Sequence, residues 1–153
     1  MTVRGTLYTD GGSRGNPGPA GIGIVLLREN GEICCSGGRF LGECTNNVAE
    51  YEALIWGIEA AIACGVTDLL VRADSELVVK QMRGEYKVKH AGLQPLHARA
   101  KTAARGVASI RYEHVRREQN TRADELANAA MDARCDVGDV PVSGSAEDQG
   151  TLF

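Results

Sequence analysis

Residues 8–18 read YTDGGSRGNPG, and this stretch decides how the first part of the chain folds. An apolar run from Val3 to Thr9 leads into a single carboxylate, Asp10, and two glycines follow at once. One interpretation is a tight turn, because Asp, Gly, Asn and Pro are the residues that turns favour. The other is that Asp10 holds a cation, and that the glycines let a bulky anionic ligand approach the backbone. The stretch alone fits both interpretations.

Hydrophobic periodicity predicts strands and helices on either side of this stretch. Strands are expected at 3–9, 20–28 and 32–41, and Asn30-Gly31 between the last two is a hairpin signal. Apolar residues then recur at spacings of three and four, which predicts a long helix from Thr45 to about Gly65. The later predicted elements are a buried strand at 68–73, a helix at 75–82, a polar loop at 83–92, a helix at 93–104, a strand at 107–115 and a helix at 120–134. This order predicts an α/β fold with a mixed sheet, its first three strands antiparallel, and helices on its faces.

The bulk composition is that of an ordinary globular protein. The chain has 153 residues, of which 43% are hydrophobic and 24% charged, which suits one domain with a real core. No apolar run is long enough to cross a membrane, and no apolar segment typical of a signal peptide follows Met1, so a cytoplasmic protein without membrane contact is expected. The five cysteines form no CxxC pair and are expected to be reduced thiols. We expect a monomer.

Charge is distributed unevenly along the chain. Residues 80–122 hold eleven Lys or Arg residues against three acids, whereas the segment after Arg134 holds four acids and no base. The basic half could therefore face a polyanion although the net charge is −3. The alternative is a solvated surface. The composition of residues 135–153 predicts a flexible acidic tail after a domain at 1–134.

Four carboxylates fall at the ends of predicted elements: Asp10, Glu50, Asp74 and Asp124. Each has a structural alternative, because Asn47-x-x-Glu50 and Thr121-x-x-Asp124 fit capping boxes and Asp74 could be an N-cap. Together they point elsewhere, since ligands gather at the carboxyl ends of strands in open α/β sheets. Clustered carboxylates repel one another and need cations between them, and all-oxygen ligands favour Mg²⁺ or Mn²⁺. Two such ions would suit in-line displacement at a phosphodiester.

Four segments that contain these acids resemble the motifs of type 1 ribonuclease H: YTDGGSRGNPGPAG, TNNVAEYEAL, ADSELVV and REQNTRADELAN. The resemblance runs from Val3 to about Met131. It implies a five-stranded mixed sheet and cleavage of the RNA strand of RNA–DNA hybrids, leaving 5′-phosphate and 3′-hydroxyl ends. It also implies that Asp10 bridges two Mg²⁺ ions, that Asp124 completes one, and that Glu50 and Asp74 hold the other.

The resemblance further implies a track that reads ribose 2′-hydroxyls and so tells RNA from DNA. Its predicted residues are Gly11, Gly12, Ser13, Asn16, Asn46, Asn47 and Glu50, and Thr45 and Asn46 match positions that hold the DNA strand. The alternative for Asn46 and Asn47 is helix capping. In the loop EYKVKH we predict phosphate contacts from Lys87, Lys89 and His90, against the alternative of a plain solvated loop.

The chain departs in two ways from the longer bacterial members of this family. In both it resembles the bacterial and archaeal forms that have a short catalytic loop and no basic protrusion. The chain lacks the long basic insertion, and VRREQNTRAD is too short for a mobile loop with a histidine. Arg117 or Glu118 is therefore expected to take the accessory role. His114, just upstream, is expected to face the sheet or the hybrid.

The last residues suggest a partner. Gln149, Leu152 and Phe153 form Gln-x-x-Leu-Phe, which resembles the peptide with which bacterial replication proteins dock on the DNA sliding clamp. An idle tail is the alternative. For the whole chain, the alternatives are a hybrid-binding module of the same fold without activity, another metal nuclease of the superfamily, or a replication adaptor that acts through its tail.

Overall fold

The computed structural model describes residues 1–141, so the predicted partner-binding residues Gln149, Leu152 and Phe153 lie outside the described part. The described elements are β1 (Arg4–Ser13), β2 (Gly18–Arg28), β3 (Ile33–Cys44), α1 (Asn46–Ala63), β4 (Asp68–Ala73), α2 (Glu76–Met82), α3 (Gln94–Ala104), β5 (Ser109–His114), α4 (Thr121–Ala133) and β6 (Val137–Asp139). None of the helices described in this range is long and apolar enough to span a membrane.

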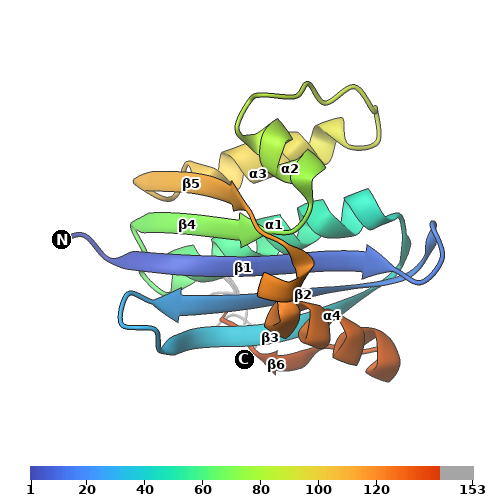
Figure 1. The fold of residues 1–153 in the computed structure, drawn as a ribbon, viewed down its shortest axis with the longest axis horizontal. Coiled ribbons are helices and arrows are strands. Elements are labelled where there is room, and N and C mark those ends of the chain that lie inside the picture. Colours follow the sequence, from blue (N-terminus) through green and yellow to red (C-terminus); the bar gives the residue numbers. More distant parts are fainter. Residues whose placement is uncertain (142–153) are drawn as a thin grey trace, which may run out of the picture.

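The strands form one mixed sheet with helices on both faces (Figure 1). The strand order is β5-β4-β1-β2-β3-β6, in which β1, β2 and β3 pair antiparallel and β4 pairs parallel to both β1 and β5. In Figure 1, α1 lies behind the sheet, α2 and α3 lie above it next to β5, and α4 lies in front of β2 and β3. The predicted α/β class and the antiparallel arrangement of the first three strands are confirmed.

The core lies between the sheet and α1. Leu7, Ile24 and Leu26 from β1 and β2 are fully buried against a broad face of α1 that includes Leu54 and Ile58. The buried face of α1 is broader than the predicted recurrence of apolar residues at spacings of three and four, because α3 packs on the same helix and buries further positions. The long helix is thus held from two sides, and burial at this scale is the main force that stabilises the domain.

Two strands differ from the prediction at their ends. β1 runs on to Ser13, although Asp10 was expected to end it, because β2 continues to pair with it as far as the Ser13–Ala20 register. Only the parallel partner stops earlier, at the register Thr9–Ala73. β3 likewise extends to Cys44. The glycines after Asp10 are therefore strand residues, and the tight-turn interpretation of Gly11 and Gly12 is wrong.

The sheet has a sixth strand where five were expected. Val137–Asp139 pairs antiparallel with Ser36–Gly38 at the edge of the sheet. The expectation that regular structure stops at Cys135 is wrong for these residues. Gly37 and Gly38 make this pairing close, since a Cβ on Gly37 would lie 2.8 Å from the Val137 carbonyl oxygen.

Candidate active site

Three of the four predicted carboxylates meet at one point. Asp10, Glu50 and Asp74 each offer an oxygen, and these oxygens lie within 4.8 Å of one another. The sheet register explains two of them, because Thr9 and Ala73 are partners in the parallel pair β1–β4. The next residue after each of them is an acid, so Asp10 on β1 and Asp74, just after β4, lie side by side.

Glu50 reaches this point because α1 approaches β1 very closely at Gly11. A Cβ on Gly11 would lie 2.5 Å from the carbonyl carbon and oxygen of Ala49 and 2.7 Å from the Glu50 nitrogen. Real Cβ atoms do not come so near to backbone, so only glycine permits this approach. The side chain missing at Gly11 therefore places Glu50 beside Asp10.

Asp124 lies in the first turn of α4 and lines the same cleft, although it is not among the three acids whose oxygens lie within 4.8 Å. Two contacts fix the start of α4. The Asn120 side-chain amide is buried and donates to the Thr9 carbonyl at 2.8 Å, and Gly23 leaves room for the Ala123 carbonyl, which a Cβ would meet at 2.0 Å. Since Thr9 precedes Asp10, this hydrogen bond ties α4 to the strand that carries the first acid.

The capping alternatives do not hold. The N-caps are Thr45 for α1 and Ser75 for α2, whose hydroxyls accept from Val48 and Val78, both at 3.3 Å. α4 begins with Asn120 as its cap, so Thr121 is already helical. Both capping boxes and the N-cap role of Asp74 are therefore wrong. Glu50, Asp74 and Asp124 therefore do not cap these helices.

The electrostatics of the acid cluster are unfavourable without cations. Burial, followed by the charges of Asp74 and Asp124, raises the pKa of Asp10 to about 8. Burial also raises the pKa of Glu50 well above its ordinary value, with the charges of Asp10 and Asp74 adding to it. The Gly11 backbone amide and Arg117 oppose this rise in the pKa of Glu50. A site of this kind, with oxygen ligands only, fits divalent cations of the Mg²⁺ class.

The predicted 2′-hydroxyl track adjoins these acids. Gly11, Gly12, Ser13 and Asn46 line the same cleft of about 660 Å³. The Ser13 backbone amide donates to Asn46 Oδ1 at 2.8 Å, and the Asn46 backbone amide donates to Asn16 Oδ1 at 3.1 Å. These bonds fasten the β1–β2 hairpin to the start of α1. Asn16 is therefore joined to the track by a hydrogen bond, whereas Thr45 acts as a cap and Asn47 does not line the cleft.

The predicted phosphate contacts Lys87, Lys89 and His90 are not part of the cleft. They lie in the irregular segment between α2 and α3, as expected. Two glutamines hold this segment by its backbone: Gln94 donates to the Val88 carbonyl at 3.0 Å, and buried Gln81 donates to the Lys87 carbonyl at 3.4 Å. Their contact with nucleic acid stays a prediction.

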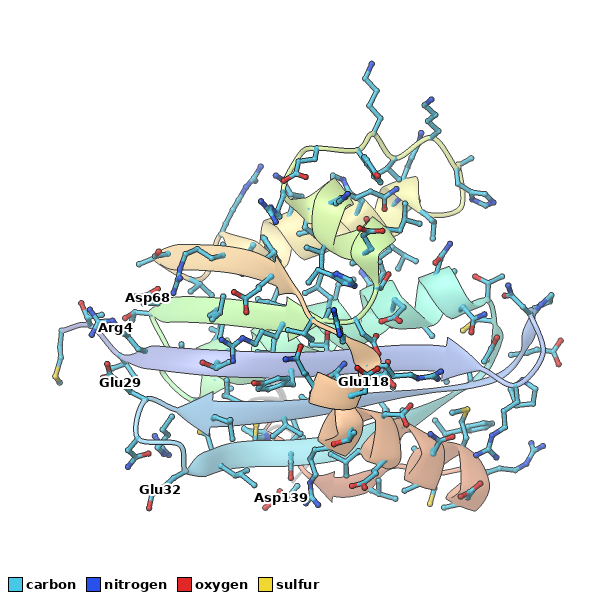
Figure 2. The ribbon with its side chains drawn as sticks, viewed as in Figure 1. Arg4, Glu29, Glu32, Asp68, Glu118 and Asp139 are labelled. Atoms are coloured by element: carbon cyan, nitrogen blue, oxygen red, sulfur yellow. The ribbon has the colours of Figure 1, made fainter. Side chains whose placement is uncertain are left out.

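Arg117 and Glu118 do line the cleft, from a short 3-10 turn at Arg117–Gln119. Figure 2 shows Glu118 beside β1 and the start of α4, well away from the end of β1 where Arg4 lies. Sequence reasoning missed Arg14, Arg116, Asn128 and Met131 as lining residues, and His114 lines the cleft as well. The only sequence signals were that Arg14 directly follows Ser13 and that Asn128 lies one helical turn after Asp124.

Comparison with known proteins agrees with this geometry. The model of the family described as "Reverse transcriptase-like" matches residues 8–130. The crystal structure of LC11-RNase H1 in complex with an RNA/DNA hybrid is 44% identical, with a TM-score of 0.81, over 85% of this chain and 98% of that one. The chain belongs to the type 1 ribonuclease H family. The relatives with a similar sequence include the bifunctional protein Rv2228c of Mycobacterium tuberculosis, 49% identical over 83% of this chain.

Other relatives of this ribonuclease H family member differ in length. Ribonuclease HI of Halobacterium salinarum is 46% identical over 82% of the chain. The chain spans 35% of the length of Rv2228c and 63% of the Halobacterium protein. The structure of the N-terminal RNase H domain of Rv2228c has a TM-score of 0.84 and is 47% identical, covering 86% of this chain and 96% of that one.

Proposed function

We propose that this chain is an endoribonuclease that hydrolyses the RNA strand of RNA–DNA hybrids and leaves 5′-phosphate and 3′-hydroxyl ends. The observation that supports this most strongly is the single cleft that holds all four carboxylates together with Gly11, Gly12, Ser13 and Asn46. The LC11 relative, which is bound to an RNA/DNA hybrid in its crystal structure, adds support.

The four acids would hold two Mg²⁺ ions, for which Mn²⁺ can substitute. Asp10, Glu50 and Asp74 form one ligand group, because their oxygens already lie within 4.8 Å of one another. Asp10 and Asp124 would form the other, with Asp10 shared. When bound, the ions supply the positive charge that activates water and stabilises the leaving 3′ oxygen. The protein's own contribution is to hold four carboxylates from four separate segments of the chain at fixed positions.

Selectivity for RNA would come from the track beside the acids. Gly11 and Gly12 expose backbone, and Asn46 is fixed by two hydrogen bonds that it shares with Ser13 and Asn16. Such groups can bind ribose 2′-hydroxyls, which DNA lacks, without reading base edges. The enzyme would therefore tell the two strands apart and cut with little regard to sequence.

Arg117 and Glu118 would take the accessory role near the acids. Arg117 lies close enough to oppose the rise in the pKa of Glu50, and both residues line the cleft. Substituting each with Ala should lower kcat without abolishing cleavage. Unchanged kcat in both variants would remove them from the mechanism.

The decisive experiment is cleavage of a labelled RNA–DNA hybrid with Mg²⁺, beside duplex DNA and duplex RNA. We expect cleavage of the RNA strand in the hybrid only, and loss of activity in Asp10→Asn. A folded chain that binds the hybrid but leaves the RNA intact would support the alternative, a hybrid-binding module without activity.

A second role rests on the sequence alone. The C-terminal sequence resembles a peptide that docks on the DNA sliding clamp through Gln149, Leu152 and Phe153. Such docking would tether the enzyme, as a monomer, to replicated DNA. Clamp pull-down with Leu152 and Phe153 changed to Ala tests this. Retention equal to that of the unchanged chain would dismiss the clamp as a partner.

A further inference from the structure

The cleft contains a positive side chain on the β1–β2 hairpin to which neither the family resemblance nor the proposed mechanism assigns a role. Arg14 directly follows the track residue Ser13 and lines the cleft with the acids. The other arginines of the cleft, Arg116 and Arg117, come from the segment after β5. Arg14 is thus the positive group that the hairpin itself brings to the RNA track.

The backbone of Arg14 is fixed, but its side chain is held by exposed partners. Its amide donates to the Pro19 carbonyl at 2.8 Å, which closes the hairpin. Its guanidinium Nη2 lies 2.7 Å from Asp132 Oδ1 and 3.2 Å from Asn128 Oδ1, both on α4. The Asp132 side chain is 69% exposed and that of Arg14 is 47% exposed. Exposed ion pairs of this kind contribute little and are easily exchanged.

The remaining donors of Arg14 are available for a ligand. Within residues 1–141, every contact recorded for the guanidinium uses Nη2, so Nε and Nη1 have no protein partner there. Guanidinium groups bind phosphate through two parallel hydrogen bonds, which are stronger than an exposed pair with one carboxylate oxygen. A phosphate in the cleft would therefore compete well with Asp132.

We propose that Arg14 binds a phosphate of the RNA strand, and that Asp132 holds the guanidinium over the cleft until the substrate replaces it. The strand is RNA because Arg14 continues the track Gly11–Ser13, to which the ribose of that strand is assigned. Asn128 would keep the guanidinium near the cleft while the phosphate replaces Asp132. Its side-chain oxygen accepts from Arg14, and its side-chain amide donates to the Asp124 carbonyl at 3.0 Å. This inference rests on the proposed function and names a substrate contact of the same site.

The two partners of the pair should respond in opposite directions. Arg14→Ala should raise KM for the hybrid about 5- to 20-fold with kcat nearly unchanged, because one charge-assisted contact is lost. It should also reduce the slope of log Kd against log salt by about 0.7 to 0.9. Asp132→Asn should leave KM unchanged or lower it about 2- to 5-fold, because it releases the guanidinium. The double variant should behave like Arg14→Ala, and Arg14→Lys should recover part of the binding.

Matched controls separate this contact from a general change in charge. Arg28→Ala removes one positive charge at the far end of β2, where Arg28 pairs in register with Gly5, and should not change KM. Asp136→Asn removes an exposed acid near the end of α4 and should not lower KM. Thermal unfolding of every variant shows whether the fold is intact, and binding measured by anisotropy in an Asp10→Asn background gives Kd without cleavage.

The outcomes distinguish the two proposals. If the unchanged chain cleaves the hybrid but Asp132→Asn raises KM as much as Arg14→Ala does, the pair only joins the hairpin to α4, and the proposed contact is wrong. An unaltered KM and salt slope in Arg14→Ala would also overturn it. An unchanged chain that neither binds nor cleaves the hybrid would overturn the proposed function, and the Arg14 contact with it.

Discussion

Replacing Asp10 with Asn should make the metal-free protein more stable at neutral pH while it abolishes cleavage. Asp10 is 8% exposed and lies beside Asp74 and Asp124, and this burial, followed by the neighbouring charges, raises the pKa of Asp10 to about 8 in the folded protein. The ordinary value is 3.8. Between these two pH values the folded state binds a proton that the unfolded chain has released, so stability falls as the pH rises from about 4 to about 8.

The size of the effect follows from the shift. At pH 7 the unfolded chain has passed its pKa by about 3.2 pH units while folded Asp10 is still mostly protonated, and each unit corresponds to about 1.36 kcal/mol. The upper limit is therefore about 4 kcal/mol, and we expect Asp10→Asn to gain on the order of 2 to 4 kcal/mol at pH 7. At about 2 to 4 °C per kcal/mol, Tm should rise by roughly 5 to 15 °C. At pH 5 the gain should shrink to about 1 to 2 kcal/mol, because the pH lies closer to the unfolded pKa.

Thermal unfolding followed by circular dichroism in EDTA, at pH 5, 7 and 8.5, measures this directly. Asp136→Asn is the matched control, because its carboxylate is exposed and should leave Tm unchanged. Added Mg²⁺ should raise the Tm of the unchanged chain and have much less effect on Asp10→Asn. An Asp10→Asn protein that is no more stable than the unchanged chain at pH 7 or 8.5 would refute the view that the acids repel one another without cations.

Three further predictions concern the backbone, the basic loop and the metal. Gly11→Ala should lower the free energy of unfolding by about 3 kcal/mol or more and abolish activity, because the new Cβ would lie 2.5 Å from the Ala49 backbone. Gly12→Ala, whose Cβ would have its nearest contact at 3.7 Å, should unfold like the unchanged chain in denaturant titrations and should only weaken hybrid binding. Gln94→Ala should raise KM for the hybrid with kcat unchanged and make hybrid binding less dependent on salt, since the Val88 carbonyl loses the 3.0 Å bond that holds the basic loop of Lys87, Lys89 and His90. An unchanged KM would show that this loop does not bind the hybrid. Calorimetric titration with Mg²⁺ should show proton release and an affinity that increases from pH 6 to 8, because bound cations displace the proton that the raised pKa of Asp10 retains; affinity independent of pH would contradict this.

The sequence predicted the acids better than it predicted the strands that carry them. Asp74 and Asp124 were found because a change of hydrophobic period marks the boundary beside each of them. Asp10 was assigned to the end of a strand, because glycines are usually punctuation in a single sequence. In the structure the antiparallel partner β2 supplies hydrogen bonds that carry β1 past Asp10 to Ser13. Pairing with the next strand of the hairpin decided where β1 ends, and the residues of β1 alone do not reveal that pairing.

The same reason explains the two other omissions. Val137–Asp139 is too short for a periodic signal, and it is a strand only because Ser36–Gly38 offers an open edge. Arg14 looked like a turn residue, since nothing local shows that the hairpin folds back onto α4 and brings Arg14 to Asp132. Sequence reasoning identifies groups whose chemistry and spacing are local. It missed the strand Val137–Asp139 and the place of Arg14, because no motif assigns a role to these residues and their partners lie far along the chain.

Two glycines on the central strands determine where the two acids on helices lie. Gly11, next to Asp10 on β1, permits α1 to approach at Ala49, which places Glu50. Gly23 is the register partner of Asp10 on β2, and it permits α4 to approach at the Ala123 carbonyl, which places Asp124. The two helices come from opposite faces of the sheet (Figure 1). In this chain Glu50 and Asp124 reach Asp10 because Gly11, beside Asp10 on β1, and Gly23, across from it on β2, carry no side chain that would keep the two helices away.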